Sequence, residues 1–546
     1  MDRPILRNKL YLYLTEFFAG MSVMAVELGA SRLLAPYFSS SQIVWTIIIG
    51  TIMIAMALGN LYGGRMADKD PNPDKLYKRI IIAAIWIAAI PVVGKYVILA
   101  ISALIIFTVN TNFLVIAGFA ACMIIFVFPL FLLGTVTPSL VKFSVDSLDD
   151  SGSVVGKLNA SNTIGSIIGT FVPTFISIPA VGTAITFLIF AGILLALCIV
   201  YFVSSKINFS QAKRVPASIV IFLVCCLLGH SNSFAFWQTN LTYEGESIYN
   251  YLQVHEEGNQ VILSTNVLFG VQSVYQKDKG PTGLYYDYAM ASLPMVGTSE
   301  PMKILILGNG SGTFATQCER YYDNLDITGV EIDEKITQLA RDYFELPEDV
   351  PVITYDGRAY LNASKDKYDV IMVDAYQDIT IPFQMSSKEF FQLVADHLDE
   401  DGVMVVNLNM RSNSPGNIND YLADTIGAVF PNIYTAEVLG CTNRILYASF
   451  NPQTEENLAN AIDKETDADL YYMMSLAQVG MQKYNPGNLI MTDDKAPVEL
   501  LGMKVIDELI SDEVAYYKKI FNEEGIEGLT SLILREVTNY KKSIDK

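Results

Sequence analysis

The chain has 546 residues, of which 51% are hydrophobic and 17% are charged, and its mean hydropathy is +0.33. This composition excludes an ordinary water-soluble protein and predicts an integral membrane protein. Residues 1–240 carry 15 Lys and Arg against 9 Asp and Glu, whereas residues 241–546 carry 22 against 48, a net charge of −26. Such an acidic half repels nucleic-acid phosphates, so we expect no nucleic-acid partner. A cationic substrate or product and a merely solvated acidic surface are the two explanations that remain.

The six cysteines and three histidines are scattered along the chain and have neither the spacing of a zinc site nor that of a disulfide framework. We therefore expect free thiols and no bound metal. The same scarcity argues against nucleophilic catalysis by a cysteine–histidine pair.

Seven apolar runs before residue 237 are long enough to cross a bilayer, which takes about 20 residues. They are Tyr11–Ala35, Ile43–Gly64, Ile80–Val109, Phe113–Thr137, Leu158–Ile178, Thr183–Val203 and Ala217–Phe236. Lys and Arg cluster at the N-terminus and near residues 65–79, 142–157 and 206–214, and the positive-inside rule places all of these in the cytoplasm. The first six runs then form three hairpins of a multi-pass domain in the cell membrane.

The seventh run creates a conflict about sidedness. A seventh full crossing would place the acidic half outside the cell, where nucleotide cofactors are scarce. An extra crossing within Ile80–Val109 would remove the conflict but would move the later basic loops outside. The conflict also disappears if Ala217–Phe236, which is interrupted by glycine and polar residues, re-enters the membrane or lies at its surface. Because of cofactor supply, we expect the acidic half to be cytoplasmic.

Small residues at helix-packing spacing predict a compact bundle, because they let helices approach closely. The pairs are Gly59 with Gly63, Gly152 with Gly156, and Gly165 with Gly169. The first run also carries Glu16, Glu27 and Arg32, and charged groups at that depth are costly enough to be site candidates. Glu27 and Arg32 either pair or reach the interface, or they line a path or pocket, and the sequence leaves both explanations open.

After Trp237 the pattern changes to short alternating runs, which predict a small antiparallel β-sheet. From Met302 onward, apolar strands alternate with helical stretches, which predicts a doubly wound α/β sheet. The predicted strands lie at residues 303–308, 326–330, 351–355, 368–374, 402–409 and 445–450. We expect four domains: a transmembrane domain at 1–236, a small sheet at 237–280, a Rossmann-like domain at 281–450 and a helical extension at 451–546.

Candidate binding residues follow the predicted strands, at the edge where doubly wound sheets bind their ligands. The first strand runs into a turn in which Gly308, Gly310 and Gly312 let the backbone pass close to a ligand. Glu331 follows at about 20 residues, the spacing at which a carboxylate reaches a ribose hydroxyl, and Asp333 lies beside it. These residues predict a nucleoside site.

Two more aspartates follow the third and fourth predicted strands. Asp356, with Gly357 behind it, is placed to accept a hydrogen bond from an adenine amino group, and Asp374 faces whatever reacts. A glycine turn alone is weak evidence, since many Rossmann-like sites share it. The ordered set of a turn followed by three acids is a stronger signature.

The segments KILILGNGSG, VEIDEK, YDGRAYL and YDVIMVDAY resemble the spermidine synthase, or polyamine aminopropyltransferase, family, a branch of the class I methyltransferase fold. ESIYNYLQV and FGVQS are similar to that family's N-terminal sheet. The membrane half and the late segment TDDKAPVELL resemble the membrane-fused subfamily. The resemblance implies an α-helical transmembrane bundle ahead of a Rossmann-like catalytic domain. It also implies transfer of an aminopropyl group to an amine, with release of 5′-methylthioadenosine.

The resemblance further implies roles for particular residues. Asp374 takes the proton of the attacking amine with the help of a nearby tyrosine, Tyr376 or Tyr286, and Asp287, beside Tyr286, is a further catalytic candidate. Glu331 and Asp356 hold the nucleoside. Further contacts with the co-substrate are expected from Asn250, Gln272, Gly308, Gly310, Ser311, Gly312, Asp333 and Gly357.

Several positions depart from the family pattern. Ser311 stands where the family has an aspartate against the aminopropyl ammonium. Losing that charge removes a repulsion toward the carboxylate of ordinary S-adenosylmethionine, which is substantial in a poorly solvated site. The family's Tyr-His-Glu becomes Tyr286-Asp287-Tyr288, its early glutamine becomes Asn250, and its second aspartate shifts by one residue to Asp378. The acids that grip a polyamine are therefore fewer.

Four functions remain open: an aminopropyltransferase, a lyase or cyclase that consumes S-adenosylmethionine, a methyltransferase with a membrane substrate, and a transporter that senses a nucleotide. The co-substrate is decarboxylated S-adenosylmethionine or S-adenosylmethionine, and the expected partners are the lipid bilayer and a cationic small molecule such as a polyamine. Asp493, Asp494 and Glu499 either hold a cationic substrate or belong to a helix cap. The amphipathic tail from Val505 packs on the domain or on a neighbouring copy, and we expect a homo-oligomer.

Overall fold

The computed structural model describes residues 4–38, 41–109, 112–145, 151–204, 214–231, 234, 241–265, 271–297, 300–374, 381–409, 412, 414–508 and part of 510–525. The chain divides into two compact units. The first contains residues 1–239, 244–251 and 266–268, and the second contains residues 240–243, 252–265 and 269–546. The assignment of four domains stays a prediction.

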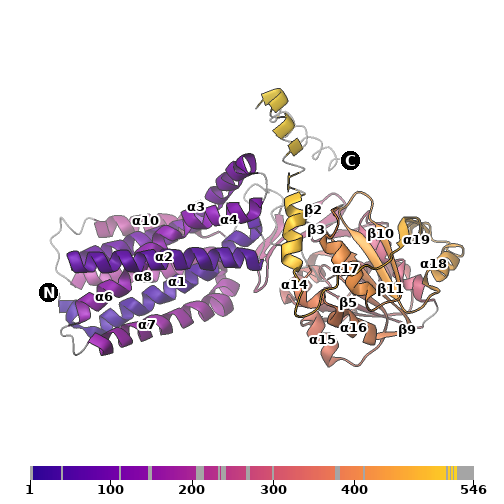
Figure 1. The fold of residues 1–546 in the computed structure, drawn as a ribbon, viewed down its shortest axis with the longest axis horizontal. Helices are drawn as coiled ribbons and strands as arrows, with labels where there is room; N and C mark the ends of the chain where they lie inside the picture. Colours follow the sequence, from indigo (N-terminus) through magenta and orange to yellow (C-terminus); the bar gives the residue numbers. More distant parts are fainter. Residues whose placement is uncertain are drawn as a thin grey trace. The chain divides into compact units, whose positions relative to one another are not determined.

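The first unit is a bundle of long apolar helices that run alongside one another (Figure 1). They are α1 Lys9–Phe38, α2 Gln42–Lys69, α3 Pro73–Thr108, α4 Phe113–Ile125, α5 Val127–Gly134, α6 Val136–Ser144, α7 Ser151–Val172, α8 Ile178–Ser204 and α10 Arg214–Gly229, with short turns η1 Pro4–Arg7 and η2 Pro173–Ser177. Among the described residues, five stretches are long and apolar enough to cross a membrane, and Phe113–Ile125 and Val215–Gly229 are shorter apolar helices. Each predicted run overlaps a helix, but the number of crossings stays a prediction.

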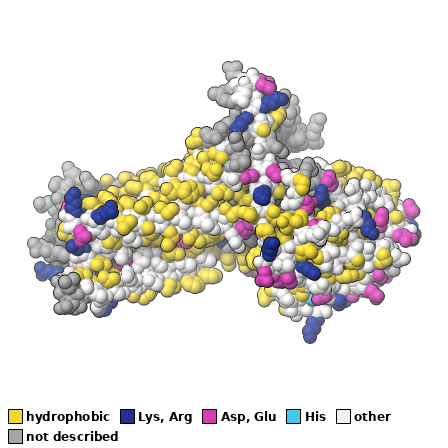
Figure 2. Space-filling view, in the orientation of Figure 1, with side chains coloured by type: hydrophobic (Ala, Val, Ile, Leu, Met, Phe, Trp, Pro, Cys, Tyr) yellow, Lys and Arg dark blue, Asp and Glu magenta, His cyan; other side chains and the backbone are white. Residues whose placement is uncertain are grey.

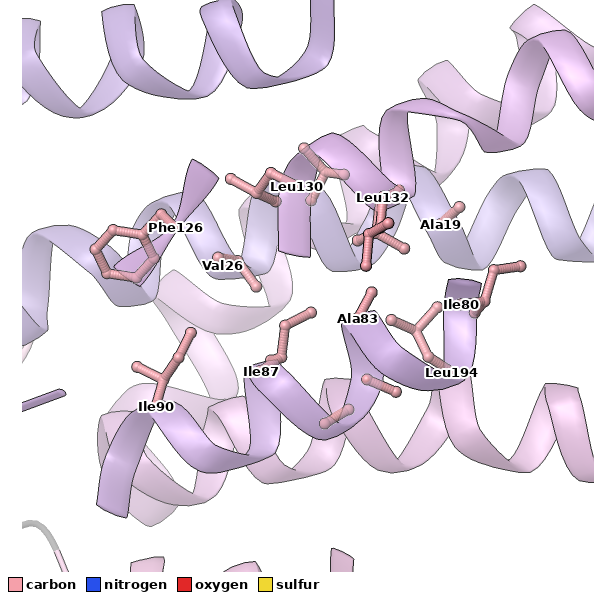
Figure 3. Packing of buried hydrophobic residues seen from close by; sticks show 14 of the residues in the cluster. Ala19, Val26, Ile80, Ala83, Ile87, Ile90, Phe126, Leu130, Leu132 and Leu194 are labelled. Carbon is pink, nitrogen blue, oxygen red and sulfur yellow. The ribbon is translucent and has the colours of Figure 1, made fainter. Parts of the chain in front are cut away.

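Apolar side chains form both the outside and the inside of this bundle. On the outside, large apolar side chains stay exposed, such as Met53 at 66% and Leu227 at 73%, and hydrophobic atoms cover much of the visible face (Figure 2). On the inside, Ile87, Leu130 and Leu194 belong to one buried cluster (Figure 3). An exposed apolar surface of this extent suits contact with lipid.

Glycines allow the closest contacts between these helices. A Cβ atom on Gly165 of α7 would overlap the carbonyl oxygen of Phe17 on α1. A Cβ atom on Gly59, Gly63 or Gly169 would also lie too close to backbone atoms of a neighbouring helix. A Cβ atom on Gly152 or Gly156 would meet no described atom within 4 Å, so the predicted close packing at that pair is not found in the described part of the chain.

Charged residues of α1 have different surroundings. Glu16 is fully buried, and its Oε1 accepts hydrogen bonds from Thr137 Oγ1 at 2.5 Å and Asn162 Nδ2 at 2.8 Å. Its Oε2 is buried without a hydrogen-bond partner among the described atoms. The Arg32 guanidinium donates to the backbone carbonyl of Ile248. The Glu16 carboxyl group therefore links α1 to α6 and α7.

Four strands form the small antiparallel sheet that the sequence predicts. They are β1 Leu241–Glu246, β2 Tyr251–Glu257, β3 Gln260–Thr265 and β4 Ser273–Gln276, in that order. β2 pairs with β3 and β3 with β4 in antiparallel register. The alternation of apolar residues along β2 and β3 explains one buried face, on which Leu252, Val254 and Leu263 pack.

The second unit is built on an eight-stranded sheet with the order β12-β10-β11-β9-β8-β5-β6-β7. Its strands are β5 Met302–Leu307, β6 Leu325–Glu331, β7 Val352–Thr354, β8 Tyr368–Val373, β9 Leu398–Leu408, β10 Asn432–Glu437, β11 Arg444–Ser449 and β12 Met481–Lys483. The strands from β7 to β9 run parallel, whereas β11, β10 and β12 continue the sheet antiparallel. The α/β architecture is confirmed, and β10 and β12 are additions that the sequence did not predict.

Helices connect and cover these strands (Figure 1). They are α11 Tyr285–Ala289, α12 Ser292–Val296, α13 Thr313–Tyr321, α14 Glu334–Tyr343, α15 Gly357–Ala363, η3 Phe383–Met385, α16 Lys388–Asp396, α17 Ile418–Gly427, α18 Thr454–Ile462 and α19 Ala468–Gly480. The central strand β8 is buried along its whole length, as expected of a parallel strand covered on both faces. Ile304, Met372 and Val405 from three adjacent strands share one core.

Candidate active site

Three neighbouring strands bring the candidate residues to one edge of the large sheet. β5 lies between β6 and β8. The backbone N–H of Gly308, after β5, donates to the Val330 carbonyl of β6 at 2.9 Å, and the N–H of Asp374, after β8, donates to the Leu307 carbonyl of β5 at 2.9 Å. The crossover direction of the chain changes beside β5, and such a switch point is where open α/β sheets bind ligands.

The turn after β5 requires glycine. Gly308, Gly310 and Gly312 have φ angles of 84°, 53° and 79°, in the left-handed region that favours this residue. A Cβ atom on Gly312 would also lie 2.5 Å from Leu346 Cδ1. Gly312 directly precedes α13, which has no side-chain cap at its start. The N–H groups of Gly308, Gly310 and Gly312 are used within the protein, so it is the uncapped first turn of α13 that can present backbone N–H groups to a ligand.

Glu331 is held by the turn that it faces. Its Oε2 accepts the Gly310 N–H at 2.9 Å, and its Oε1 accepts the Asp333 N–H at 3.0 Å. Burial raises the pKa of Glu331 to about 7, although these hydrogen bonds lower it. Each carboxylate oxygen can accept a second hydrogen bond, so the group can also receive ribose hydroxyls.

Asp333 and Asp356 each begin a helix. Asp333 Oδ1 accepts the Lys335 N–H at 3.1 Å at the start of α14, and Asp356 Oδ1 accepts the Ala359 N–H at 2.8 Å at the start of α15. Capping restricts each side chain to one orientation. A cap uses one carboxylate oxygen, so the other oxygen of Asp356 can accept from an adenine amino group.

Asp374 receives a hydrogen bond from a side chain on each of its two carboxylate oxygens. The Tyr285 hydroxyl donates to its Oδ2 at 2.5 Å, and the Asn407 side-chain amide donates to its Oδ1 at 2.9 Å. Asn407 in turn accepts from the Asn443 amide at 2.9 Å. Burial raises the pKa of Asp374 to about 6, while the bonds from Tyr285 and Asn407 lower it. The group is therefore ionised at neutral pH and can accept a proton.

A tyrosine that the sequence did not suggest, Tyr285, contacts Asp374 among the described residues. Tyr286 lies directly against Tyr285, with ring centroids 4.0 Å apart, and its hydroxyl lies near the side chains of Ser273 and Thr313. Tyr376 and Asp378 lie outside the described residues. Tyr285 is the described tyrosine that donates directly to Asp374, and Tyr286 supports it.

Ser311 is 1% exposed and belongs to a cluster of hydroxyl groups. Its Oγ lies 2.8 Å from Thr313 Oγ1, whose own proton goes to the Val274 carbonyl at 3.0 Å, so Ser311 is the donor of the pair. Tyr286 and Ser273 complete the cluster. The side chains of Ser311 and Thr313 therefore make this part of the turn polar but uncharged. No three His, Cys, Asp or Glu residues suited to a metal ion come together in the described part of the chain.

Three other predicted site residues have different surroundings. Asp287 accepts from the Thr282 N–H at 2.8 Å, its hydroxyl at 2.7 Å and the Gly283 N–H at 2.7 Å, an arrangement that stabilises the preceding turn. Gln272 lies beside β4 in the second unit, whereas Asn250 belongs to the first unit. The catalytic role of Asp287 and the binding roles of Gln272 and Asn250 stay predictions.

Sequence reasoning missed Tyr285, Asn407, Asn443 and Arg358. Asn407 had a usable signal, because it lies near the end of a buried apolar strand, as the other site residues do. Tyr285 was hidden by its neighbour Tyr286, and α11 had no periodicity long enough to orient it. Arg358 and Asn443 contact residues that are distant in sequence, which no local pattern reveals.

Acidic residues at the ends of adjacent parallel strands, beside a glycine turn, are typical of Rossmann-like domains. The sequence profile described as "Spermine/spermidine synthase domain" matches residues 284–438. A "Probable polyamine aminopropyl transferase" from Bifidobacterium longum (strain NCC 2705) is 51% identical over 350 residues, which cover 61% of this chain and 77% of that protein. The chain belongs to the spermine/spermidine synthase family and is a transferase of the polyamine aminopropyltransferase type.

More distant relatives match a smaller part of the chain. A "Polyamine aminopropyltransferase" from Vibrio vulnificus (strain CMCP6) is 27% identical over 231 residues, which cover 41% of this chain and 75% of that protein. A solved structure titled "Crystal Structure of Spermidine Synthase in Complex with Transition State Analogue AdoDATO" is 20% identical with a TM-score of 0.38, and the match covers 44% of this chain and 84% of that one.

Proposed function

We propose that the protein transfers an aminopropyl group from decarboxylated S-adenosylmethionine to a polyamine-type amine and releases 5′-methylthioadenosine. Family membership supports this class of donor and acceptor. The observation that carries the proposal is the state of Asp374, a carboxylate held by Tyr285 and Asn407 at the strand end next to the glycine turn. An ionised base in this position suits removal of a proton from an attacking amine.

The proposed chemistry is one displacement. The nitrogen lone pair of a neutral amine attacks the methylene carbon next to the sulfonium, the carbon–sulfur bond breaks, and sulfur keeps the electron pair as the thioether of methylthioadenosine. The nitrogen then loses its proton to Asp374. A base positioned in this way contributes about 10²–10⁴ in rate. Glu331 and Asp356 would bind the ribose and the adenine, and the uncapped N–H groups at the start of α13 would face the same ligand.

A second candidate reaction uses S-adenosylmethionine itself as donor. The observation in its favour is Ser311, whose uncharged hydroxyl stands where the family has an aspartate, so this position places no like charge against a donor carboxylate. Attack by the donor's own carboxylate or amine, or elimination, would give methylthioadenosine without an acceptor. Methyl transfer would instead give S-adenosylhomocysteine.

One experiment separates these reactions. The purified full-length protein is incubated with each donor, with and without putrescine, and the nucleoside product is identified by mass. We expect the decarboxylated donor to give methylthioadenosine together with a lengthened polyamine. Neither product should form when putrescine is left out. Methylthioadenosine without putrescine would support the lyase or cyclase reaction, and S-adenosylhomocysteine would refute aminopropyl transfer.

We also propose that the helical unit anchors the enzyme in the cell membrane and that the acidic unit is cytoplasmic. The supporting observations are the five apolar stretches and the basic loops between them. Cysteine labelling tests this orientation. Single cysteines are introduced at Asp399 and at Lys69 and are exposed to an impermeant reagent in intact and in lysed cells. We expect both positions to react only after lysis. Cross-linking in the same membranes tests the expected homo-oligomer.

A further inference from the structure

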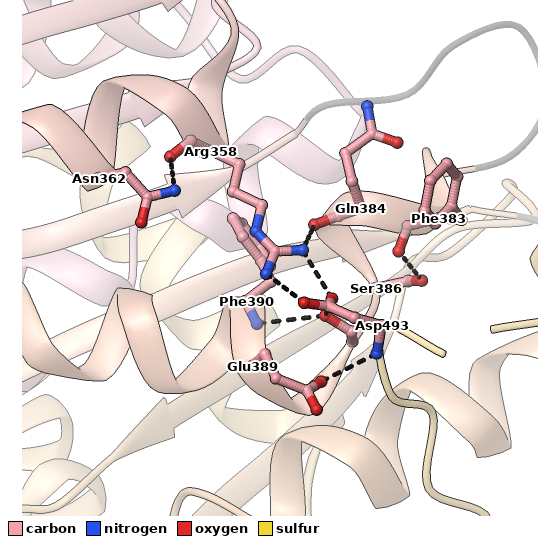
Figure 4. A network of polar contacts seen from close by, with 9 residues as sticks. Arg358, Asn362, Phe383, Gln384, Ser386, Glu389, Phe390 and Asp493 are labelled. Atoms are coloured by element: carbon pink, nitrogen blue, oxygen red, sulfur yellow. Dashed lines mark hydrogen bonds and ion pairs between the residues drawn. The ribbon is translucent and has the colours of Figure 1, made fainter. Parts of the chain in front are cut away.

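Arg358 and Asp493 join segments that lie far apart in the sequence, and Figure 4 shows them at the centre of a polar network. Arg358 is the second residue of α15, and Asp356 caps that helix. The Nη1 and Nη2 atoms of Arg358 donate to Oδ1 and Oδ2 of Asp493, both at 2.7 Å, which is the bidentate geometry of a strong arginine–carboxylate pair. Nη1 also donates to the Gln384 carbonyl at 2.9 Å.

Asp493 is fixed by further contacts on its other side. The Ser387 hydroxyl donates to Asp493 Oδ1 at 2.5 Å, and the Asp493 N–H donates to Glu389 Oε2 at 3.0 Å. The Lys388 N–H donates to the Met491 carbonyl at 2.9 Å. Both carboxylate oxygens of Asp493 are therefore used within the protein. The hydrogen bond from Arg358 is the main reason why the pKa of Asp493 is lowered. This geometry favours a structural partner of α15 over a group that grips a cationic substrate.

The short turn η3 also contacts the start of α15. Met385 of η3 lies close to the helix start, since its Cε would be 3.3 Å from a Cβ atom on Gly357. Gln384, which accepts from Arg358, belongs to the same short turn. Asp356 therefore sits at a helix end that is held by η3 and by the segment around Asp493.

We propose that Arg358 and Asp493 are positioning residues for nucleoside binding, because their pair fixes the helix start on which Asp356 presents its carboxylate. The proposal rests on the nucleoside site of the proposed function. A partly exposed ion pair adds little to global stability, since solvent screens it and two long side chains must be ordered. The ion pair has a more direct effect on ligand binding, because it restricts Asp356 to one orientation. A small displacement of Asp356 weakens every hydrogen bond that it makes to the ligand.

Binding of 5′-methylthioadenosine to the detergent-solubilised full-length protein, measured by calorimetry, tests the proposal. We expect Arg358→Gln and Asp493→Asn each to weaken binding about tenfold and the double variant to be no weaker than either, because both remove the same pair. Arg358→Asp combined with Asp493→Arg restores part of the affinity. Asp399→Asn, a change of an exposed acid near the start of β9, is the control and binds normally. In turnover assays the KM for the donor rises about tenfold while kcat changes less than about threefold.

Different failures have different meanings. Single variants that bind as well as the wild type, or losses that add in the double variant, would refute the positioning role. So would a lowered melting temperature with an unchanged KM, which indicates a structural role only. If Arg358→Gln does not fold, Asp493→Asn and Arg358→Lys, which keeps the charge but loses the bidentate geometry, provide the same test. A wild-type protein that binds no methylthioadenosine would instead refute the proposed function.

Discussion

Glu16 of the helical bundle and Asp374 of the α/β unit both receive hydrogen bonds from two side chains, yet the two carboxyl groups differ in layout. Both donors to Glu16 converge on Oε1, its Oε2 has no partner among the described atoms, and the residue is fully buried between three helices. Asp374 receives one donor on each oxygen and keeps some exposed surface at the end of a strand. The comparison indicates that burial alone does not make a catalytic group. A strand end offers both support and an approach for substrate, whereas the side of a packed helix offers support only.

The sharpest test of this contrast replaces each carboxyl group by its amide. Asp374→Asn is expected to lower kcat about 10³-fold, since the amide cannot take up the amine proton. Glu16→Gln is the matched change in the bundle and should alter kcat less than about twofold. Initial rates in detergent at pH 8 measure both. Equal losses in the two variants, or full activity of Asp374→Asn, would contradict the assignment.

Glu331→Gln addresses the nucleoside side of the same strand edge. The amide loses the charge that strengthens hydrogen bonds from ribose hydroxyls, so we expect methylthioadenosine to bind about 10–100-fold more weakly. Because the pKa of Glu331 is raised to about 7 by burial, the carboxylate form increases as the pH rises through 7. Wild-type affinity should therefore increase between pH 6 and pH 8, and calorimetry should find this dependence absent in the variant. A pH-independent wild type would count against Glu331 as the acceptor.

Helix packing in the bundle can be tested with paired glycines. Gly165→Leu would press a side chain into the Phe17 carbonyl of α1 and should destabilise the bundle by about 1–3 kcal/mol or prevent its assembly. Gly156→Leu, on the same helix with nothing within 4 Å of its Cβ position, should be tolerated. Thermal unfolding in detergent compares them, and similar losses for both would argue against close packing at Gly165.

The smallest expected effect concerns the hydroxyl that donates to Asp374. The hydrogen bond from Tyr285 stabilises the carboxylate and lowers its pKa, so Tyr285→Phe should raise that pKa from about 6. The acidic limb of the kcat/KM profile should then move to higher pH by about half a unit, with less than about threefold loss at pH 8. Tyr286→Phe is the neighbouring control and should move the limb less. A shift of the limb to lower pH would contradict the assigned hydrogen bond.

Much of this site was predictable because its residues follow short runs rich in aliphatic residues that form strands, mostly buried in β5, β6 and β8 and exposed in the edge strand β7. Glu331, Asp356 and Asp374 each come directly after such a run, and parallel strands bring their carboxyl ends to one edge. The same logic gave the architecture from β5 to β9. It failed at β10 and β12, since these strands are short and mix polar with apolar residues, and they pair antiparallel with partners that only the tertiary structure supplies.

Contacts between segments that are distant in the sequence could not be predicted from a local sequence pattern. The choice between Tyr285 and Tyr286 depends on the orientation of α11, a helix of five residues that is too short to show an apolar face. Arg358 and Asp493 are separated by 135 residues, and only the packing of η3 and α16 brings them together. The Gly152 and Gly156 pair illustrates the opposite error, because the spacing of small residues permits a close helix contact but does not require one.

The hydrogen bond from the Asp374 N–H to the Leu307 carbonyl has an evolutionary consequence. It ties Asp374 to the strand that leads into the glycine turn, so the separation between this carboxylate and the turn depends on the pairing of β5 with β8. Ser311 lies in the turn, outside those two strands. Under the proposed function, mutations at Ser311 can therefore alter which donor is accepted while Asp374 keeps its distance from the turn, and new donor specificities can accumulate without a change in the strand pairing.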